Sequence, residues 1–343
     1  MDSSTSEPQN VTDAAVFDET FGAVLKQAVY YSWYKGVFIC VLVFAAAGIT
    51  GNLLTILAYV KYEQLQSPTN LLICSQSIGD LLICLCGGPM FAAFNYTEAG
   101  QALASSNKYL CLVSLLVSLV ALQSSITNIL ALSTERFIAV YFSLHYYNWV
   151  TDRNVKIVVV VIWAVIISIN CLPLFGWNDW KSEVACMPVT VYPQLFVQSL
   201  FALPSLIFVL VSTVENFAMA VTAVRRQRSI AAAVVVPNAD QQTEEAKIKS
   251  GNQFKVTKML LLVVGCFFTA WLPWIILSSI LYRVPSSWKM NGVPKGILIA
   301  FEYSKCVLGA NSIANPFIYG WKNKMFRDAY YKLLGIRRTQ DET

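Results

Sequence analysis

The sequence contains few charged residues. Asp, Glu, Lys and Arg together make up 13% of the 343 residues, whereas hydrophobic residues make up 56% and the mean hydropathy is +0.54. A soluble domain carries roughly 25% charged residues. The composition therefore excludes an ordinary soluble domain and indicates a membrane protein. The net charge of +5 is small and follows from membrane topology, so nucleic-acid binding is not expected.

Patterns typical of enzymes and metal sites are also missing. The single histidine, His145, has no cysteines at metal-ligand spacing. The sequence has no glycine-rich phosphate-binding loop, no Gly-x-Ser-x-Gly turn and no paired catalytic carboxylates. We therefore expect neither an enzyme nor an organic cofactor.

Long apolar segments are what the sequence does contain. A transmembrane helix needs about 20 mostly apolar residues. Seven segments reach that length: 37–60, 71–94, 110–131, 155–175, 195–221, 259–281 and 297–318. The third and seventh are diluted by polar residues, as is typical of helices that face protein or water. The predicted fold is an all-α membrane protein, a bundle of seven transmembrane helices.

The basic residues predict the orientation of this bundle. Most of the 25 lysines and arginines lie in the C-terminal segment and in the loops on its side of the membrane. Cytoplasmic loops carry such an excess. We expect a multi-pass protein of the plasma membrane, with the N-terminus outside and the C-terminus in the cytoplasm.

Three regions are predicted along the chain. They are an extracellular tail (1–33), the transmembrane domain (34–321) and an amphipathic helix with a short cytoplasmic tail (322–343). The helix is inferred from apolar residues spaced by three and four after the last span, which is typical of helices lying on a membrane surface. We expect no cleavable signal peptide in the N-terminal tail, and its sequon at Asn10 predicts glycosylation.

Two of the nine cysteines differ from the others in position. Cys111 opens the third span and Cys186 lies in the loop after the fourth. Both are expected on the oxidising side of the membrane, where disulfides persist, so we predict a disulfide between them. The remaining cysteines lie inside spans, as small buried hydrophobic residues do.

Several polar side chains fall at mid-membrane depth. They are Asp80, Ser125, Asn311, Ser312 and Asn315. A carboxylate buried in a membrane needs partners, and oxygen ligands suit a small hard cation such as sodium. A sodium ion at Asp80, a water cluster and a plain hydrogen-bond network therefore all remain open.

The spans also carry a series of motifs. In order, these are Gly51-Asn52, Asp80, Cys111, Glu135-Arg136-Phe137, Trp163, Pro204, FFTAWLP with Phe267, Trp271 and Pro273, and NPFIY from Asn315 to Tyr319. Over nearly its whole length the chain thus resembles rhodopsin-like (class A) G protein-coupled receptors. The stretches LQSSITNILALSTERFIAV, LPLFGWND and NPFIYGWKNKMFRD resemble adenosine receptors in particular.

This resemblance implies a receptor that binds a small molecule between spans three, five, six and seven. The ligand would activate a heterotrimeric G protein by opening span six on the cytoplasmic side. The candidate ligand-binding residues are Ser118, Leu122, Trp271, Trp274, Ser278, Glu302, Lys305 and Gly309. The candidate switch residues are Glu135, Arg136, Ile126, Pro204, Phe267, Trp271, Pro273, Asn315, Pro316 and Tyr319. Membrane lipid is the remaining expected partner.

The adenosine-receptor ligand residues themselves are not matched. Pro188 and Val189 stand where those receptors have Phe and Glu, Ser278 stands for Asn, and Gly309 stands for His. A different ligand is therefore expected. Ser118 replaces the Asp with which aminergic receptors hold an amine, which argues against an amine.

Two alternative functions remain open. An opsin-like photoreceptor would need a lysine for retinal, and Lys305 lies about one turn from the matching position, Gly309. We therefore expect Lys305 to pair instead with Glu302, three residues earlier, or with a polar ligand. A channel or transporter is less favoured, because seven spans do not divide into an inverted repeat.

Two departures from the family pattern affect the switch. Ser212 stands where a Tyr often meets Arg136 in the active state, and Gln253 stands where an acid often holds Arg136 at rest. We predict a weakly restrained Arg136, with Glu135 as its main restraint, and notable basal signalling.

Overall fold

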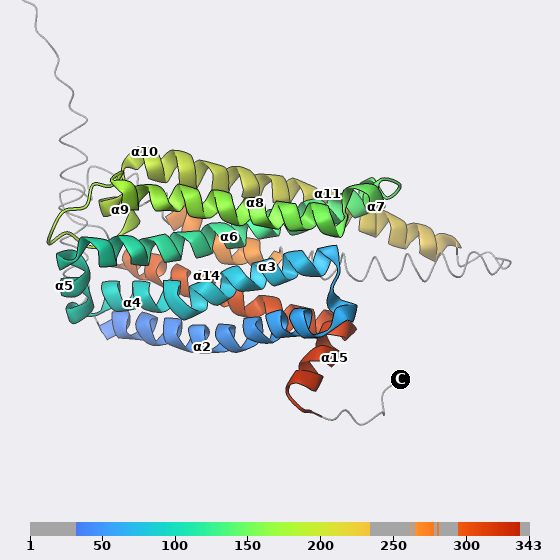
Figure 1. Cartoon of the computed structure of the whole chain (residues 1–343), viewed down its shortest axis with the longest axis horizontal. Helices are drawn as coiled ribbons and strands as arrows, with labels where there is room; N and C mark the ends of the chain where they lie inside the picture. Colours follow the sequence, from blue (N-terminus) through green and yellow to red (C-terminus); the bar gives the residue numbers. More distant parts are fainter. Residues whose placement is uncertain (1–31, 234–261, 263–264, 278–279, 281–293, 337–343) are drawn as a thin grey trace, which may run out of the picture.

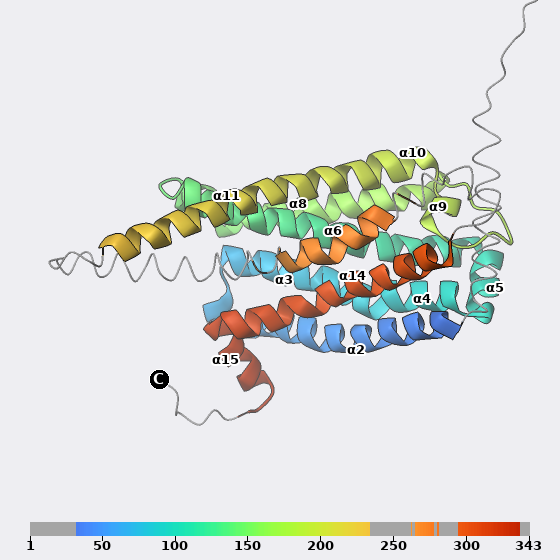
Figure 2. The same cartoon turned by 180° about the vertical axis from the view of Figure 1, so that it is seen from behind.

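The computed structural model describes residues 32–233, 262, 265–277, 280 and 294–336. Long helices lie side by side along one axis, as Figures 1 and 2 show. The main helices are α2 (Ser32–Lys61), α3 (Pro68–Leu82), α4 (Gly88–Tyr96), α6 (Lys108–Tyr141), α8 (Asp152–Cys171), α11 (Leu203–Ala233) and α14 (Lys295–Lys322). Within the described residues, six spans are long and apolar enough to cross a membrane, and Gly265–Leu277 is a shorter apolar helix. These correspond in order to the seven predicted spans.

Shorter helices lie at the two ends of the bundle (Figure 1). They are η1 (Glu63–Leu65), α5 (Glu98–Ser106), α7 (Tyr146–Trp149), η3 (Leu172–Phe175), α9 (Pro188–Val191), α10 (Gln194–Phe196) and α15 (Lys324–Leu333). The end with α5 and α9 also holds the Cys111–Cys186 disulfide and is called the disulfide end below. The opposite end, with α7 and α15, is called the α15 end.

The third span, α6, is the central helix. In its most apolar window 67% of the residues are buried, compared with 17% for α8. This burial agrees with the interior position expected from its polar residues. The helix continues to Tyr141, well past the predicted end of the span at residue 131, and so carries Glu135 and Arg136 at the α15 end.

Two prolines follow short π-helical turns. The turn η2 (Ile83–Gly87) joins α3 to α4 just before Pro89, and η4 (Val197–Ala202) precedes Pro204 in α11. A proline lacks an N–H donor and clashes with the carbonyl one turn earlier, and a π turn locally widens the helix at that point.

Polar residues fix where several helices begin. The side chains of Ser67, Asn107 and Thr151 accept hydrogen bonds from backbone N–H groups in the first turns of α3, α6 and α8. Such N-caps satisfy amides that have no partner inside the helix and stabilise it by about 1 kcal/mol each.

The amphipathic helix α15 packs against the bundle. Phe326 and Ala329 on its apolar face are fully buried, and the Tyr330 hydroxyl lies 2.7 Å from that of Thr55 in α2. A Cβ on Gly320 would lie 3.1 Å from the Tyr330 ring. Part of the face predicted to meet lipid therefore meets α2 and α14 instead, and Gly320 makes room for it.

Candidate functional site

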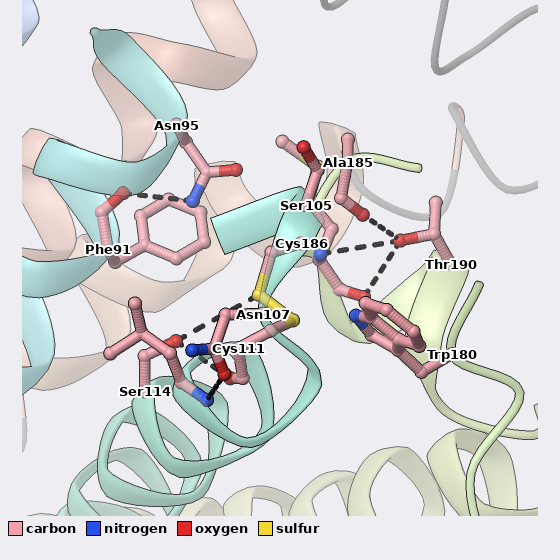
Figure 3. The surroundings of a disulfide bond; sticks show 12 residues. Phe91, Asn95, Ser105, Asn107, Cys111, Ser114, Trp180, Ala185, Cys186 and Thr190 are labelled. Atoms are coloured by element: carbon pink, nitrogen blue, oxygen red, sulfur yellow. Dashed lines mark hydrogen bonds between the residues drawn. A yellow bond between two sulfur atoms is a disulfide. The ribbon is translucent and has the colours of Figure 1, made fainter. Parts of the chain in front are cut away.

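A disulfide at the disulfide end joins the start of α6 to the loop after α8. Figure 3 shows Cys111 and Cys186 bonded, with the Ser114 side chain beside the sulfur of Cys186. The predicted disulfide is confirmed. The Thr190 hydroxyl donates to backbone oxygens in this loop, including that of Met187 at 3.0 Å. The bond thus fixes the loop segment that contains Met187, which lines the cavity described next.

A cavity of about 450 Å³ opens between the helices on the inner side of this loop. Its wall includes residues of α2, α4, α6, α11, Gly265–Leu277 and α14. Pockets that bury small organic molecules measure roughly 300–1,000 Å³ and are mostly apolar. The size and the lining both suit such a molecule.

The structure brings most of the candidate ligand residues to this cavity. Ser118, Leu122, Trp271, Trp274, Lys305 and Gly309 are among the residues that line it. Glu302 is buried behind Lys305 and is not among those lining residues, whereas Ser278 lies outside the described residues. The Ser118 hydroxyl is bound to the backbone oxygen of Ser114 at 2.8 Å.

Glu302 and Lys305 form an ion pair in the wall of this cavity. The Lys305 Nζ lies 2.8 and 2.9 Å from the two Glu302 carboxylate oxygens. The hydroxyl of Tyr96 donates to Glu302 Oε2 at 2.6 Å, and the ring of Phe301 lies 4.5 Å from the ammonium. Sequence spacing predicts the ion pair, but it does not bring in Tyr96, which comes from another span.

A buried polar network lies at the deep end of the cavity, around Asp80. This carboxylate is fully buried and accepts hydrogen bonds from Ser312 at 3.0 Å, Asn315 at 2.8 Å and Gln76 at 3.2 Å. Ser125 belongs to the same network, since its hydroxyl oxygen accepts from the Gln76 amide at 2.9 Å. Gln76 is not among the residues predicted from the sequence, although it lies one helical turn before Asp80 in α3.

The same network offers oxygen atoms for a cation. The side-chain oxygen of Asn311 is buried and has no hydrogen-bond partner in the described structure. Asn311, Ser125 and Ser312 line the cavity together with Asp80. One carboxylate, two hydroxyls and one free amide oxygen are a suitable donor set for a hard cation.

Aromatic side chains connect the cavity to the middle of the bundle. Ile126, Phe267 and Trp271 are buried in one cluster with Val209. The rings of Phe267 and Trp271 are 5.3 Å apart, and that of Trp274 lies 5.8 Å beyond Trp271. A movement of Trp271 on the cavity wall would therefore change its packing against Phe267.

The prolines predicted to act in the switch lie in three different helices. Pro204 is the second residue of α11, Pro273 lies within Gly265–Leu277, and Pro316 lies inside α14. A Cβ on Gly51 would come within 3.0 Å of Pro316, so α2 and α14 pack closely here. Tyr319, one turn further along, is fully buried.

At the α15 end the buried residues Glu135 and Arg136 form a cluster with two partly buried side chains. Arg136 Nε and Nη2 both bind the Glu135 carboxylate. Thr69 in α3 donates to Glu135 Oε1 at 3.0 Å and accepts from Arg136. The Tyr146 hydroxyl in α7 donates to the same carboxylate oxygen and lies 3.2 Å from Arg136 Nη2.

Two further side chains therefore contact Arg136 besides Glu135, which is the predicted main restraint. Thr69 and Tyr146 come from other elements, and no spacing in the sequence indicates that they meet Arg136. Ser212 is buried and its backbone oxygen accepts from Asn216, while Gln253 lies outside the described residues.

Tyr146 remains protonated at physiological pH. Burial, and after it the nearby Glu135 carboxylate, raise the pKa of Tyr146 to about 12. The neutral phenol is therefore the form that donates to Glu135, and this donor is retained below about pH 12.

The sequence has a second sequon besides that of Asn10, at Asn95-Tyr96-Thr97. Asn95 is 3% exposed, and its side-chain nitrogen donates to the backbone oxygen of Phe91 at 2.9 Å. It is therefore inaccessible to a glycan in the folded bundle. Asn10 lies outside the described residues, so its glycosylation stays a prediction.

Comparison with known proteins agrees with these features. Residues 51–319 match the family model described as 7 transmembrane receptor (rhodopsin family). The chain is 25% identical over 315 residues to adenosine receptor A2b of Homo sapiens, covering 85% of this chain and 88% of that protein. It is 26% identical over 309 residues to adenosine receptor A2a of Canis lupus familiaris, covering 85% and 70% respectively.

The family match covers more than half of the chain and includes the Asp80 network, the aromatic cluster and the Glu135–Arg136 cluster. It is a family of multi-pass membrane receptors, not of enzymes or transporters. The chain belongs to the rhodopsin family of seven-transmembrane receptors.

Proposed function

We propose that the chain is a plasma-membrane receptor that binds a small molecule in the cavity and activates a heterotrimeric G protein. The disulfide end would face outward and the α15 end the cytoplasm. The observation that carries this proposal is the cavity itself. It extends from Lys305 to Asp80 and includes Trp271 on its wall.

The mechanism would be a shift between two populations. A ligand favours the active state only if it binds that state better than the resting state. Contact with Trp271 would alter its packing on Phe267 and allow Gly265–Leu277 to move at Pro273. Arg136 would then leave Glu135, Thr69 and Tyr146 and become available to the G protein.

The relatives named for adenosine make that nucleoside an obvious compound to test. The residues that line this cavity give it limited support, because Gly309 and Pro188 stand where the resemblance expects His and Phe. The opsin-like alternative has less support, since the Lys305 ammonium is already held by Glu302.

A sodium ion held by Asp80, Ser125, Asn311, Ser312 and Asn315 is part of this proposal. The side-chain oxygens of Asn311 and Asn315, buried and without a hydrogen-bond partner in the described structure, support it, and the Asn315 amide nitrogen donates to Asp80. Bound there, the ion would supply a positive charge that stabilises the resting arrangement.

The experiment that tests the proposed function is a ligand panel in cells that express the receptor. Nucleosides, lipids, amines and peptides would be applied, with retinal as a spectroscopic test of the opsin alternative, and several G protein sensors would be recorded. A response that is lost when Trp271 is changed to Ala, at equal surface expression, supports the proposal. Absence of ligand-dependent and ligand-free signalling through every G protein class would refute it.

A further inference from the structure

Lys305 is the charged group that the cavity presents to a ligand. Of the charged residue types (Asp, Glu, Lys and Arg), the described residues that line the cavity include Asp80 and Lys305 alone. Asp80 already accepts three hydrogen bonds from within the bundle. A ligand entering from the disulfide end therefore meets the Lys305 ammonium as its principal charged contact.

This ammonium has one hydrogen-bond donor left. A lysine has three donors, and the described residues that accept hydrogen bonds from Lys305 are limited to Glu302, whose two carboxylate oxygens lie 2.8 and 2.9 Å away. The rings of Phe301, Phe91 and Tyr96 surround the ammonium at 4.5, 5.2 and 5.8 Å. The third N–H is thus available to an acceptor on a ligand.

The charge balance at this point selects the kind of acceptor. Glu302 is 2% exposed, and its negative charge is matched by Lys305 within a poorly solvated wall. An anionic ligand would have to share Lys305 with Glu302, and two like charges a few ångströms apart repel strongly where water is excluded. A cationic ligand would meet Lys305 itself. An uncharged carbonyl oxygen takes the third donor and adds no charge.

The rest of the wall suits an apolar molecule. Beyond Lys305 the cavity is lined largely by apolar side chains, such as Phe44, Leu115, Leu119, Phe201 and Val209. Several hydroxyls of a sugar would be buried against such a wall without partners, which is costly. A ligand with one polar end and an apolar body leaves few such groups unpaired.

The geometry points to an uncharged, mainly apolar ligand whose hydrogen-bond-accepting end is held by Lys305. The inference rests on the proposed function, because it names the ligand class of the same cavity. Glu302 and Tyr96 then serve as positioning residues that hold the ammonium in place.

The test uses four probes on the purified full-length receptor in lipid nanodiscs. Oleamide, oleic acid and oleylamine share one hydrocarbon chain and differ in a neutral, acidic or basic end, and adenosine is the fourth. Thermal stabilisation as a function of probe concentration gives the affinities. We expect oleamide to bind at least about tenfold more tightly than the other three probes. Each of those would leave a buried charge or several buried hydroxyls poorly paired.

Removal of Lys305 alone would leave Glu302 buried and unpaired, so both are replaced. The double variant Lys305→Met/Glu302→Gln should lose the preference for oleamide, whereas Lys35→Met, an exposed lysine at the start of α2, should keep it. Gly309→Leu fills part of the cavity and should abolish binding of every probe that enters it. This variant controls for probes that merely partition into the lipid.

Several results would overturn the inference. They are tighter binding of oleic acid, oleylamine or adenosine than of oleamide, no binding of oleamide, or an unchanged preference in the double variant. G protein activation is recorded separately. Activation by adenosine with no binding of oleamide would leave the proposed function standing and refute the ligand class. Binding of oleamide that depends on Lys305, with no change of G protein signalling in either direction, would support the ligand class and count against the proposed function.

Discussion

At the residue scale, the adjacent charges Glu135 and Arg136 are stabilised by each other and by two neighbours. Arg136 is 8% exposed, and an unpaired charge buried in this way is strongly destabilising. Thr69 and Tyr146 complete the hydrogen bonds of the pair. The resting position of Arg136 thus depends on α3, α6 and α7 together.

We predict that Glu135→Gln raises basal signalling. The amide keeps the size of the side chain but removes the charge, and hydrogen bonds to charged groups contribute about 1.5–3 kcal/mol. Loss of that stabilisation from the resting state shifts the population toward the active state several-fold or more. Ligand-free G protein activation at matched surface expression measures the effect, and an unchanged baseline would contradict it.

Tyr146→Phe is expected to have the same direction and a smaller effect. It removes one donor to Glu135 and one contact of Arg136 but leaves the ion pair intact. The matched control is Tyr147→Phe, which changes a 68% exposed neighbour in the same short helix. Equal basal signalling in the two variants would show that Tyr146 does not restrain Arg136.

Asp80 gives the residue-scale test of the sodium site. If sodium binds there, replacing potassium chloride by sodium chloride at constant ionic strength should raise the thermal stability of the purified receptor. Asp80→Asn removes the charge and should abolish the difference between the two salts. A sodium effect that persists in Asp80→Asn would place the ion elsewhere, and no effect in the unmodified chain would favour a plain hydrogen-bond network.

At the element scale, the packing of α15 depends on a small residue in α14. The Tyr330 ring occupies the space beside Gly320, and Phe326 and Ala329 are buried next to it. A larger side chain at residue 320 would push α15 away from α2, and overpacking of this kind costs about 1–3 kcal/mol.

Gly320→Leu should therefore lower the thermal stability of the purified receptor. The control is Gly296→Leu, in the first turn of the same helix, where an added Cβ has no atom within 4 Å. Because leucine favours helix more than glycine does by about 0.8 kcal/mol, the control should be neutral or slightly stabilising. Similar losses in both variants would mean that Gly320 is not needed for close packing.

At the scale of the whole molecule, the sequence predicts the architecture because membrane spans are constrained so strongly. Each must satisfy its own backbone hydrogen bonds in lipid, so length and apolarity identify the seven segments in order. The disulfide follows from compartment chemistry. The order of motifs such as Asp80 and Glu135–Arg136 then indicates the family.

Contacts between spans are what the sequence does not predict. Tyr96 meets Glu302 across 206 positions of sequence, and Thr55 meets Tyr330 across 275. Nothing in local periodicity encodes such pairs, because they depend on how the helices rotate and lean. The π turns before Pro89 and Pro204 are missed for a related reason, since proline predicts a disturbed helix without specifying which backbone bonds replace the lost one.

The cavity near the disulfide end and the Glu135–Arg136 cluster at the α15 end must be coupled if the chain signals as proposed. Coupling between two binding sites is reciprocal, so an agonist found in the ligand panel should bind more tightly, by roughly 5–150-fold, when a nucleotide-free G protein is present. Arg136→Ala should remove this gain and leave the affinity of the uncoupled receptor nearly unchanged, because Arg136 lies outside the cavity. An equal gain in agonist affinity in both forms would mean that the ligand and the G protein are coupled through contacts other than Arg136.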